Sequence, residues 1–457
     1  AQGRKNMTFD FIRASFPEAF SAGSLPNAGR EPSVSPPPAL KNFVPRQPET
    51  FTEAGIEPRV LLPLVIRYLY QHGKQSGLNV SRQLRLPLNL VEPTLHLLRS
   101  EQLIFPKGAA AGNDFVYEIL PKGIEKAQMD LELSTYCGAA PVSIDQYTNS
   151  VFRQSLRNHR IKLPQMIKAL SEFSVSNLLL SQLGQAVNSG KTLMLYGPPG
   201  NGKSVLSKQL LKSAHTNIWI PRVLSVGSEI IRVFDPSIHQ ELPFDQAHTL
   251  PPGFEIDHRW VYIQRPTVVA GGELELENLE VTQNPITRIL EAPIQVKSNC
   301  GCLVIDDFGR QRVGINELLN RWIVPMDTGY DYIGLPSGRQ LKLPFDQLLV
   351  FSTNFTPNKL TDDAFLRRIP YKIQVGNPTV EEFRNLFFDR AAKFGIALEP
   401  GVVDYLIERH FETQERELRF CHVEDLLNQG LDYCSFHDHP LYFDRNVADI
   451  AALNYFS

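Results

Sequence analysis

Hydrophobic positions change their spacing several times along the chain, and each change marks a different kind of element. Residues 60–73, VLLPLVIRYLYQHG, place apolar side chains three and four positions apart, which predicts an amphipathic helix. Residues 79–86 and 89–103 predict two more helices, the last capped by Asn89. Residues 103–120 then form two β-rich arms around a tip of glycine and alanine, which predicts a hairpin.

Three helices followed by a hairpin resemble a winged helix-turn-helix domain, which we expect at residues 56–136. Between residues 59 and 122, eight basic residues stand against four acidic ones, a modest positive excess. The third helix, which would face base edges in such a domain, carries Asn89, Thr94, His96 and Arg99, but also a glutamate and a proline. Protein docking is therefore the favoured role of this domain, and DNA binding is kept as an alternative.

The segments on either side of this domain have a different character. Residues 24–50 carry seven prolines, whose missing amide donors and fixed φ angles prevent regular structure. We therefore expect a flexible proline-rich segment over residues 1–55, either a linker or a strap along a surface. Residues 137–178 are expected to form a mostly helical connector.

A phosphate-binding loop is predicted farther along the chain. The β-rich run TLMLYG (192–197) is followed at once by GPPGNGKS and then by a helical pattern, the context in which this glycine-rich motif binds phosphate. Its glycines would let backbone N–H groups approach the phosphates. Lys203 would reach the β- and γ-phosphates, and the Ser204 hydroxyl would bind Mg²⁺. The predicted cofactor-binding residues are Gly197, Pro198, Pro199, Gly200, Asn201, Gly202, Lys203 and Ser204.

A second motif supplies an acid for the same site. The segment GCLVIDDFG is an apolar strand that delivers Asp306 at its carboxyl end, where open α/β sheets place their ligands. A carboxylate there can complete a Mg²⁺ shell with Ser204, so we predict these two residues as the metal ligands.

With two further elements in the expected order, the chain resembles an AAA+ ATPase. QLLVFSTNFTP (347–357) is similar to the sensor 1 strand of that family, and DDAFLRRIPYKI (362–373) to its arginine-finger segment. The resemblance implies an α/β core over 179–376 and ATP with Mg²⁺ as cofactors. It also implies a ring of subunits of the hexamer type.

The resemblance assigns catalytic roles to four residues. Asn354 would orient the attacking water, and Arg367 or Arg368 would reach the γ-phosphate of a neighbouring subunit. Asp307 falls where the family usually has a glutamate that polarises this water. Because aspartate is one methylene shorter, we expect slow but real hydrolysis.

Two inserts interrupt the predicted core. Residues 331–344 contain two short β-rich arms around Pro336-Ser337-Gly338 and resemble the pre-sensor-1 hairpin of MoxR-like proteins. We expect NIWIPRVL (217–224) to be the second core strand. A long insert over 225–299 would follow it, with its own β-rich arms around Gly271-Gly272.

The chain after the core is helical and amphipathic, which matches the small lid of AAA+ proteins at residues 377–457. The lid of this family normally carries a sensor 2 arginine, but Glu424 lies near the expected place. Arg419 or Arg416 could substitute for it, or the role could be absent.

Composition narrows the picture further. The net charge of −3 and the pI near 6.5 give no basic field over the whole chain, so nucleic acid would need a local patch. Five scattered cysteines fit reduced thiols, and no apolar run approaches the roughly 20 residues of a membrane span. We expect a cytoplasmic protein without membrane insertion. A zinc site at Cys300 and Cys302, or at Cys434 with its neighbouring histidines, is disfavoured.

These patterns together predict an α/β P-loop core with a C-terminal helical lid, preceded by a small α+β winged-helix-like domain. The expected function is Mg²⁺-dependent ATP hydrolysis that remodels or regulates a macromolecular partner, a protein more than DNA. The alternatives are a DNA-linked regulator or loader, and a nucleotide-dependent scaffold with little turnover.

Overall fold

A computed structural model describes residues 43–457, apart from 113, 172, 174, 215, 361 and 362. Most of the predicted proline-rich segment therefore lies outside the described residues. Buried side chains form five clusters, two of which cover the two faces of one parallel sheet.

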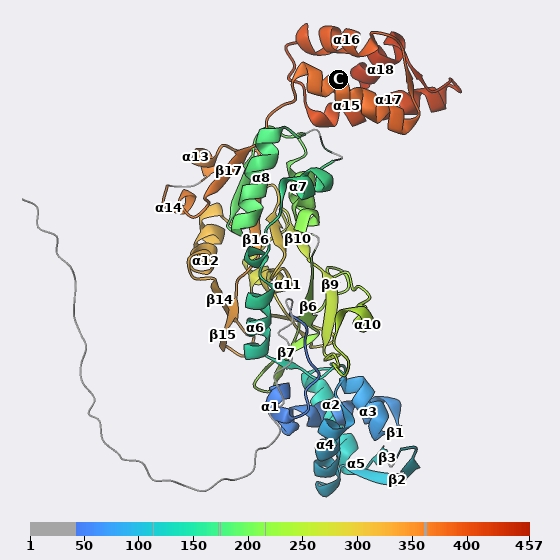
Figure 1. Cartoon of the computed structure of the whole chain (residues 1–457), viewed down its shortest axis with the longest axis vertical. Helices are drawn as coiled ribbons and strands as arrows, with labels where there is room; N and C mark the ends of the chain where they lie inside the picture. The colour runs from blue at the N-terminus through green and yellow to red at the C-terminus, as the bar shows by residue number, and fades with distance from the viewer. Residues whose placement is uncertain (1–42, 113, 172, 174, 215, 361–362) are drawn as a thin grey trace, which may run out of the picture. The chain divides into compact units, whose positions relative to one another are not determined.

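This central sheet has the strand order β10-β13-β16-β5-β17, and every neighbouring pair is parallel. Leu193 and Leu195 face the cluster that contains α8 and α9, whereas Met194 between them faces the cluster of α12. Figure 1 labels α8, α12 and the strands β10, β16 and β17 of this core. A parallel sheet buried between helices confirms the predicted α/β core. Its elements are α8 (Asn177–Ser189), β5 (Leu193–Tyr196), α9 (Lys203–Gln209), η2 (Leu210–Ala214), β10 (Thr267–Ala270), β13 (Cys302–Ile305), α12 (Ile315–Thr328), β16 (Leu348–Thr353), α13 (Pro357–Leu360), α14 (Asp363–Leu366) and β17 (Tyr371–Gln374).

The second strand of the core is not the one predicted. NIWIP forms β6 (Asn217–Pro221), which pairs antiparallel with β9 (Trp260–Gln264) in a separate two-stranded sheet. The place beside β13 is taken by β10, from the segment expected to be an arm of the insert. The other expected arm contains a short 3₁₀ helix, η3 (Leu276–Leu279). Both stretches are short and apolar, and pattern alone does not tell which one joins a given sheet.

The insert has a sheet of its own, with the order β11-β12-β8-β7-β4. Its last strand comes from the connector, so the region before the core pairs directly with the insert. The elements are β4 (Val142–Ser143), β7 (Val223–Val226), β8 (Glu229–Arg232), α10 (Gln246–Thr249), β11 (Thr282–Gln283), β12 (Leu290–Glu291) and α11 (Ile294–Lys297).

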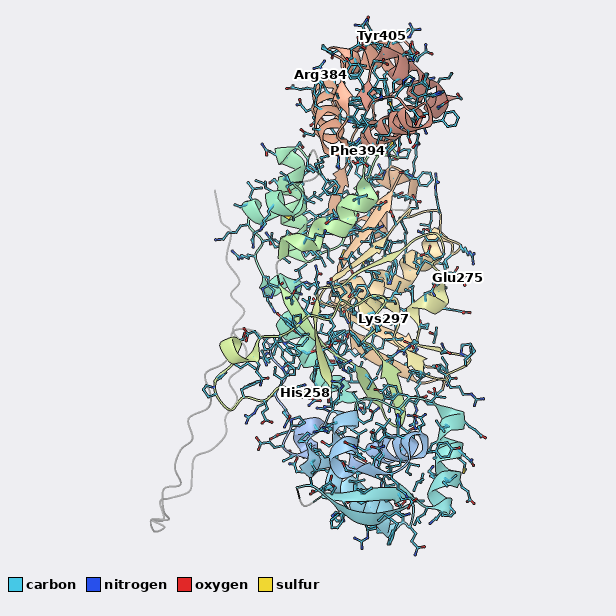
Figure 2. The ribbon with its side chains drawn as sticks, turned by 90° about the vertical axis from the view of Figure 1, so that its right-hand side faces the viewer. His258, Glu275, Lys297, Arg384, Phe394 and Tyr405 are labelled. Atoms are coloured by element: carbon cyan, nitrogen blue, oxygen red, sulfur yellow. The ribbon has the colours of Figure 1, made fainter. Side chains whose placement is uncertain are left out.

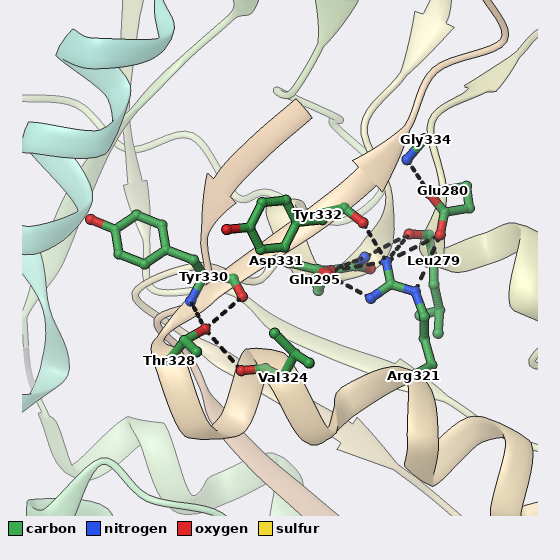
Figure 3. Close-up of polar contacts among 10 residues, drawn as sticks. All are labelled: Leu279, Glu280, Gln295, Arg321, Val324, Thr328, Tyr330, Asp331, Tyr332 and Gly334. Atoms are coloured by element: carbon green, nitrogen blue, oxygen red, sulfur yellow. Dashed lines mark hydrogen bonds and ion pairs between the residues drawn. The ribbon is translucent and has the colours of Figure 1, made fainter. Parts of the chain in front are cut away.

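The predicted hairpin before β16 is formed by β14 (Tyr330–Gly334) and β15 (Gln340–Pro344). Asp331 at its base is buried and forms a 2.5 Å ion pair with Arg321 of α12 (Figure 3). Arg321 also pairs with Glu280 at 3.1 Å, and Gln295 donates to Asp331 at 3.0 Å. A buried charge needs such partners to offset its lost hydration, so this network fixes the hairpin to the core.

The N-terminal region contains the three predicted helices and the predicted hairpin, and β1 adds a third strand in the order β1-β3-β2. Asn89 is not a cap, because α4 begins one residue earlier and the Asn89 side chain donates to the Glu49 carbonyl. Thr94 is fully buried, so it has no access to a base edge. The elements are α1 (Phe51–Ala54), α2 (Pro58–His72), β1 (Gln75–Ser76), α3 (Gly77–Leu84), α4 (Leu88–Ser100), β2 (Ile104–Ala110), β3 (Asp114–Ile119) and α5 (Pro121–Leu133).

One buried ion pair joins this region to the insert. Arg259 and Asp257 form a 2.8 Å pair with both side chains almost fully buried. The remaining guanidinium donors of Arg259 bind the carbonyl oxygens of Ala54 and Pro141, each at 2.9 Å. The residues before α1 follow the same surface, since Asp257 N–H donates to the Pro45 carbonyl.

Helices form most of the connector and of the chain after the core, as expected. The connector has α6 (Ile144–Gln154), η1 (Leu156–Asn158) and α7 (Leu163–Ala169). The C-terminal helices enclose one apolar cluster, which gives the predicted helical lid. They comprise α15 (Val380–Phe394), β18 (Ala397–Leu398), α16 (Val402–Ile407), the π-helix η4 (Glu408–Glu412), α17 (Phe420–Phe436), β19 (Tyr442–Phe443) and α18 (Arg445–Phe456). In the described part of the chain, no helix has the length and apolar character to cross a bilayer.

Candidate nucleotide site

The glycine-rich loop connects β5 to α9, and two of its glycines are required by both backbone angle and space. Gly197 has φ 144°, and a Cβ there would lie 2.2 Å from the Val375 carbonyl oxygen. Gly200 has φ 82°, and a Cβ would lie 2.5 Å from Cys421 Sγ. Side chains rarely adopt such angles and cannot approach so closely, so the loop path depends on glycine at both positions.

Lys203, in the first turn of α9, is buried against this loop. Its ammonium donates to the carbonyl oxygens of Gly197 at 2.9 Å and Pro198 at 2.8 Å. The third donor binds Asn354 Oδ1 at 2.7 Å. All three ammonium donors are therefore used, and one of them joins the loop to the end of β16.

The charges around Lys203 act in opposite directions on its pKa. Burial is the largest influence and lowers the pKa of Lys203. The carboxylates of Asp307 and Asp306 raise this pKa, and the guanidinium of Arg419 lowers it. Two aspartates from the end of β13 and an arginine from the lid thus lie within electrostatic range of the same ammonium.

Ser204 and Asp306 meet although 102 residues separate them in the chain. The Ser204 hydroxyl donates to Asp306 Oδ1 at 2.7 Å, where β13 ends beside α9. A hydroxyl and a carboxylate are hard oxygen donors of the kind that Mg²⁺ prefers, so this pair fits the predicted metal ligands.

Asp307 has an unusual backbone for a residue other than glycine, with φ 48°. Its N–H donates to Asp306 Oδ1 at 3.1 Å, and its side chain is exposed. Aspartate and asparagine tolerate this left-handed region better than most residues. The turn directs the chain away from the strand immediately after Asp306, which leaves the Asp307 carboxylate at the edge of the site.

The two predicted arginine-finger candidates have different surroundings. Arg368 is half-buried and pairs with Asp327 of α12 at 2.8 Å. Arg367 is exposed, and its side chain makes no hydrogen bond or ion pair within the described residues. Of these two candidates, Arg367 is thus the more exposed one, and it is the one without a side-chain partner in the described part of the chain.

The lid contacts the loop through the start of α17. Cys421 N–H donates to the Gly200 carbonyl at 2.9 Å, and Phe420 N–H donates to Asn201 Oδ1 at 3.3 Å. The buried Asn201 side chain in turn donates to Asn377 Oδ1 at 2.7 Å. Two backbone N–H groups at the start of α17 and the Asn377 side chain thus bind the glycine-rich loop.

Of the sensor 2 alternatives, Arg419 is the one beside the loop. Its Cδ lies 3.5 Å from where a Cβ of Gly200 would be, and its buried Nε has no hydrogen-bond partner within the described residues. Arg416 instead stacks on the Phe456 ring at 4.3 Å, inside the lid. Glu424 pairs with Arg390 at 3.1 Å.

A cavity of about 430 Å³ opens beside the loop, between α9 and the lid. Apolar side chains from three parts of the chain line it, including Val175, Leu206 and Leu386. Polar side chains line it from the lid, at Arg390, Glu424 and Asp425, and from the loop and α9, at Asn201 and Gln209. A concave and largely apolar space next to a phosphate loop is suited to a nucleobase.

Sequence reasoning missed several groups that shape this site. Cys421, Asn377 and the Val375 carbonyl all contact the loop, yet none belongs to a recognisable motif. Cys421 lies in the first turn of α17, and no sequence pattern placed that helix start beside the loop. Cys300 and Cys302 are buried away from the site, and burial raises the pKa of both thiols.

Comparison with solved structures gives likenesses of low identity. NtrX from Brucella abortus in complex with ADP is 12% identical with a TM-score of 0.38, over 62% of this chain and 56% of that chain. The Thermotoga maritima RuvB Holliday junction branch migration motor is 12% identical with a TM-score of 0.35, over 60% of this chain and 67% of its own. A mutant form of that RuvB is 13% identical with a TM-score of 0.35, over 66% of this chain and 72% of its own.

Sequence comparison adds one match. A family model described as a domain of unknown function, DUF8689, matches residues 379–454, and no curated protein matches. This chain spans just over half of the NtrX chain, so the likeness does not extend to that whole protein. The P-loop α/β fold rests on the strand order and loop geometry described above, and the matched family covers the helical lid alone.

Proposed function

We propose that this chain is a Mg²⁺-dependent ATP hydrolase of the AAA+ type that acts on a macromolecular partner as a ring of identical subunits. The observation that carries the proposal is the convergence of four side chains at the carboxyl edge of the sheet. Lys203 meets Asn354, and Ser204 meets Asp306, each pair at 2.7 Å. Strand ends and a helix start from distant segments thus form one phosphate site.

Each of these residues has a role in attack of water on the γ-phosphate. Lys203 would exchange its loop carbonyls for phosphate oxygens, while Ser204 and Asp306 would hold Mg²⁺. When bound, Mg²⁺ would supply positive charge that offsets the negative charge of the phosphate oxygens. Asn354 and Asp307 position and polarise the attacking water, and Arg419 adds charge from the lid in the role of sensor 2. The choice of ATP over GTP rests on the resemblance to AAA+ proteins.

Phosphate release by the purified chain tests hydrolysis. Lys203→Ala should reduce turnover by about 10³-fold, because it removes the main positive charge on the transferred group. Asp307→Asn should lower turnover by about 10–10²-fold while nucleotide affinity stays within a few-fold, because general-base action is lost but binding is not. Wild-type chain that binds ATP without releasing phosphate would instead be a nucleotide-dependent scaffold.

Mixing variants tests the ring. Arg367→Ala subunits keep their phosphate loop, and Lys203→Ala subunits keep Arg367, so a mixture should regain turnover that neither variant has alone. Recovery requires an arginine donated between subunits. The matched control is Arg368→Ala, which should retain turnover because Arg368 is engaged with Asp327. If the mixture stays inactive, or if Arg367→Ala alone is fully active, the arginine finger is not Arg367.

A protein partner is favoured over DNA. Of the four residues expected to read bases from the third helix, Thr94 is buried and Asn89 is engaged with the Glu49 carbonyl. His96 and Arg99 are exposed, which leaves half of the predicted reading surface. A pull-down with the Lys203→Ala variant as a substrate trap should therefore recover a protein partner. Recovery of DNA alone would instead favour a DNA-linked regulator or loader.

A further inference from the structure

A second cavity, lined by basic side chains, lies between the N-terminal region and the insert. It has a volume of about 280 Å³ and is lined by four arginines, two from the end of α3 and two from β7, β8 and the turn before them. No acidic residue is among its lining residues, and two aromatic rings contribute the remaining large side chains. These six residues are Arg82, Arg85, Arg222, Arg232, Tyr136 and Phe234.

Only two of the four guanidinium groups have carboxylate partners. Arg222 pairs with Glu241 at 3.3 Å, and Arg232 donates from Nε to Glu291 at 3.1 Å. Glu291 also lies 3.7 Å from Lys297, which is labelled in Figure 2, so its charge is shared between two cations. The side chains of Arg82 and Arg85 have no hydrogen bond or ion pair within the described part of the chain.

The positive charges at this cavity repel one another. Burial lowers the pKa of Arg222, and the guanidinium of Arg85 lowers it further. The Nε atom of Arg222 is buried without a hydrogen-bond partner in the described residues. Its guanidinium lies over the Phe234 ring at 5.2 Å, which fixes the plane of the fork. A buried donor and converging like charges are both costly unless an anion joins them.

The cavity is built on firm backbone from both sides. Arg85 ends α3 in a left-handed conformation with φ 56°, and its N–H donates to the Arg82 carbonyl. Ala140 N–H donates to the Leu84 carbonyl at 2.8 Å, which fixes the end of α3 against the connector. On the other side, β7 and β8 form a regular antiparallel pair. Residues with uncommon backbone angles, such as Arg85, often lie at functional sites, where contacts with the surrounding structure maintain their conformation.

We propose that this arginine pocket binds the phosphoryl group of a small anion. Two guanidinium groups without carboxylates supply about two positive charges, which matches the −1.5 to −2 of a phosphate monoester near neutral pH. Planar arginine forks bind phosphate oxygens in pairs, and four forks around one small space favour a tetrahedral anion. A pocket of about 280 Å³ has room for one or two phosphoryl groups but not for a macromolecule.

Bound phosphate would bridge α3 and the β7–β8 pair, two segments about 140 residues apart in the chain (85 to 222). It would therefore strengthen the attachment of the N-terminal region to the insert. The pocket is separate from the nucleotide site, since the two share no lining residue.

Calorimetric titration with inorganic pyrophosphate tests the proposal in full-length Lys203→Ala chain, whose nucleotide loop is disabled. One pyrophosphate should bind, and Arg82→Gln/Arg85→Gln in the same chain should weaken binding at least tenfold. Arg59→Gln, an exposed arginine of the same region, is the matched control and should leave binding unchanged. Affinity should fall with added KCl, because exposed charges are screened.

The double variant should also melt no lower than its parent in the absence of pyrophosphate, because it relieves repulsion rather than removing a bond. A melting temperature no lower than that of the parent would show that the loss of pyrophosphate binding does not come from misfolding of the double variant. The proposal is overturned if pyrophosphate does not bind at low salt, or if binding survives the double substitution. It is equally overturned if succinate binds as tightly as pyrophosphate, or if duplex DNA binds through these arginines while pyrophosphate does not.

Discussion

The molecule contains two places suited to a phosphate group, and they are built in opposite ways. The nucleotide loop uses glycine backbone, one lysine and two nearby aspartates, with its carbonyls already bonded to the ammonium. The arginine pocket uses four long side chains, two of them without partners in the described residues. A loop of consecutive residues depends on backbone path, whereas a ring of side chains depends on which segments fold together.

This difference determines how each place should respond to change. The nucleotide loop is sensitive to a Cβ at two positions, because Val375 leaves no space beside Gly197 and Cys421 leaves none beside Gly200. The arginine pocket is sensitive to charge and salt, because its guanidinium groups are exposed or half-buried. Substitutions in the nucleotide loop should therefore leave the arginine pocket unaffected, and substitutions in the pocket should leave the loop unaffected. Each site thus serves as a control for the other.

The largest expected effect is that of Gly200→Ala on nucleotide affinity. The new Cβ would meet Cys421 Sγ at 2.5 Å in addition to the strain of φ 82°, so we expect affinity to fall about 10²-fold. Gly202→Ala is the matched control: its φ is 74° but no atom lies within 4 Å, so its loss should be about tenfold. Equilibrium nucleotide titration measures both.

Pyrophosphate binding at the arginine pocket should remain within twofold in Gly200→Ala. Gly200→Ala/Cys421→Ala should recover part of the nucleotide affinity, because it removes the clash but not the backbone strain. Equal losses in Gly200→Ala and Gly202→Ala would show that contact with the lid does not matter.

Acid should weaken the lid, which contributes to the nucleotide site. Burial lowers the pKa of His422 to about 4, whereas an unfolded histidine titrates near its reference value of about 6.5. The unfolded chain therefore takes up the proton first, so this contribution to stability is present above about pH 6.5 and is lost as the pH falls towards 4. Allowing for partial solvent screening, we expect about 1–2 kcal/mol.

Urea unfolding at pH 7 and pH 5 measures this effect. Neutral His422 accepts the N–H of Arg419 at 3.2 Å, so protonation also disturbs the residue beside the loop. His422→Asn should reduce the pH dependence of stability, while His258→Asn, at an exposed position, should retain it. Identical pH dependence in His422→Asn and wild type would contradict the assignment.

The smallest expected effect is that of Arg82→Lys/Arg85→Lys on the arginine pocket. Lysine keeps the charge but loses the planar fork, so pyrophosphate affinity should fall only about threefold to fivefold. Comparison with Arg82→Gln/Arg85→Gln in the same titration separates the contribution of positive charge from that of the planar guanidinium fork. If lysine and glutamine variants lose the same affinity, the fork and not the charge carries recognition.

Sequence patterns predicted the central site better than its surroundings. The loop, Asp306 and Asn354 were placed correctly relative to strands and helices because each motif carries its own local context. The second core strand was misplaced, because β6 and β10 are both short apolar runs and only long-range pairing separates them. Asn89 was misplaced as a cap because α4 begins at Leu88, after Pro87.

The sequence alone determined the α/β core, the glycine-rich loop between strand and helix, and the C-terminal helices, because these follow from periodicity and from the spacing of neighbouring residues. Tertiary structure decided that Arg419 rather than Arg416 lies beside the loop. It also decided that Arg368 pairs with Asp327, whereas the Arg367 side chain has no partner among the described residues. It also brought Arg85 and Arg222 together. Such contacts form between residues far apart in the sequence when the chain folds, so no local sequence pattern predicts them.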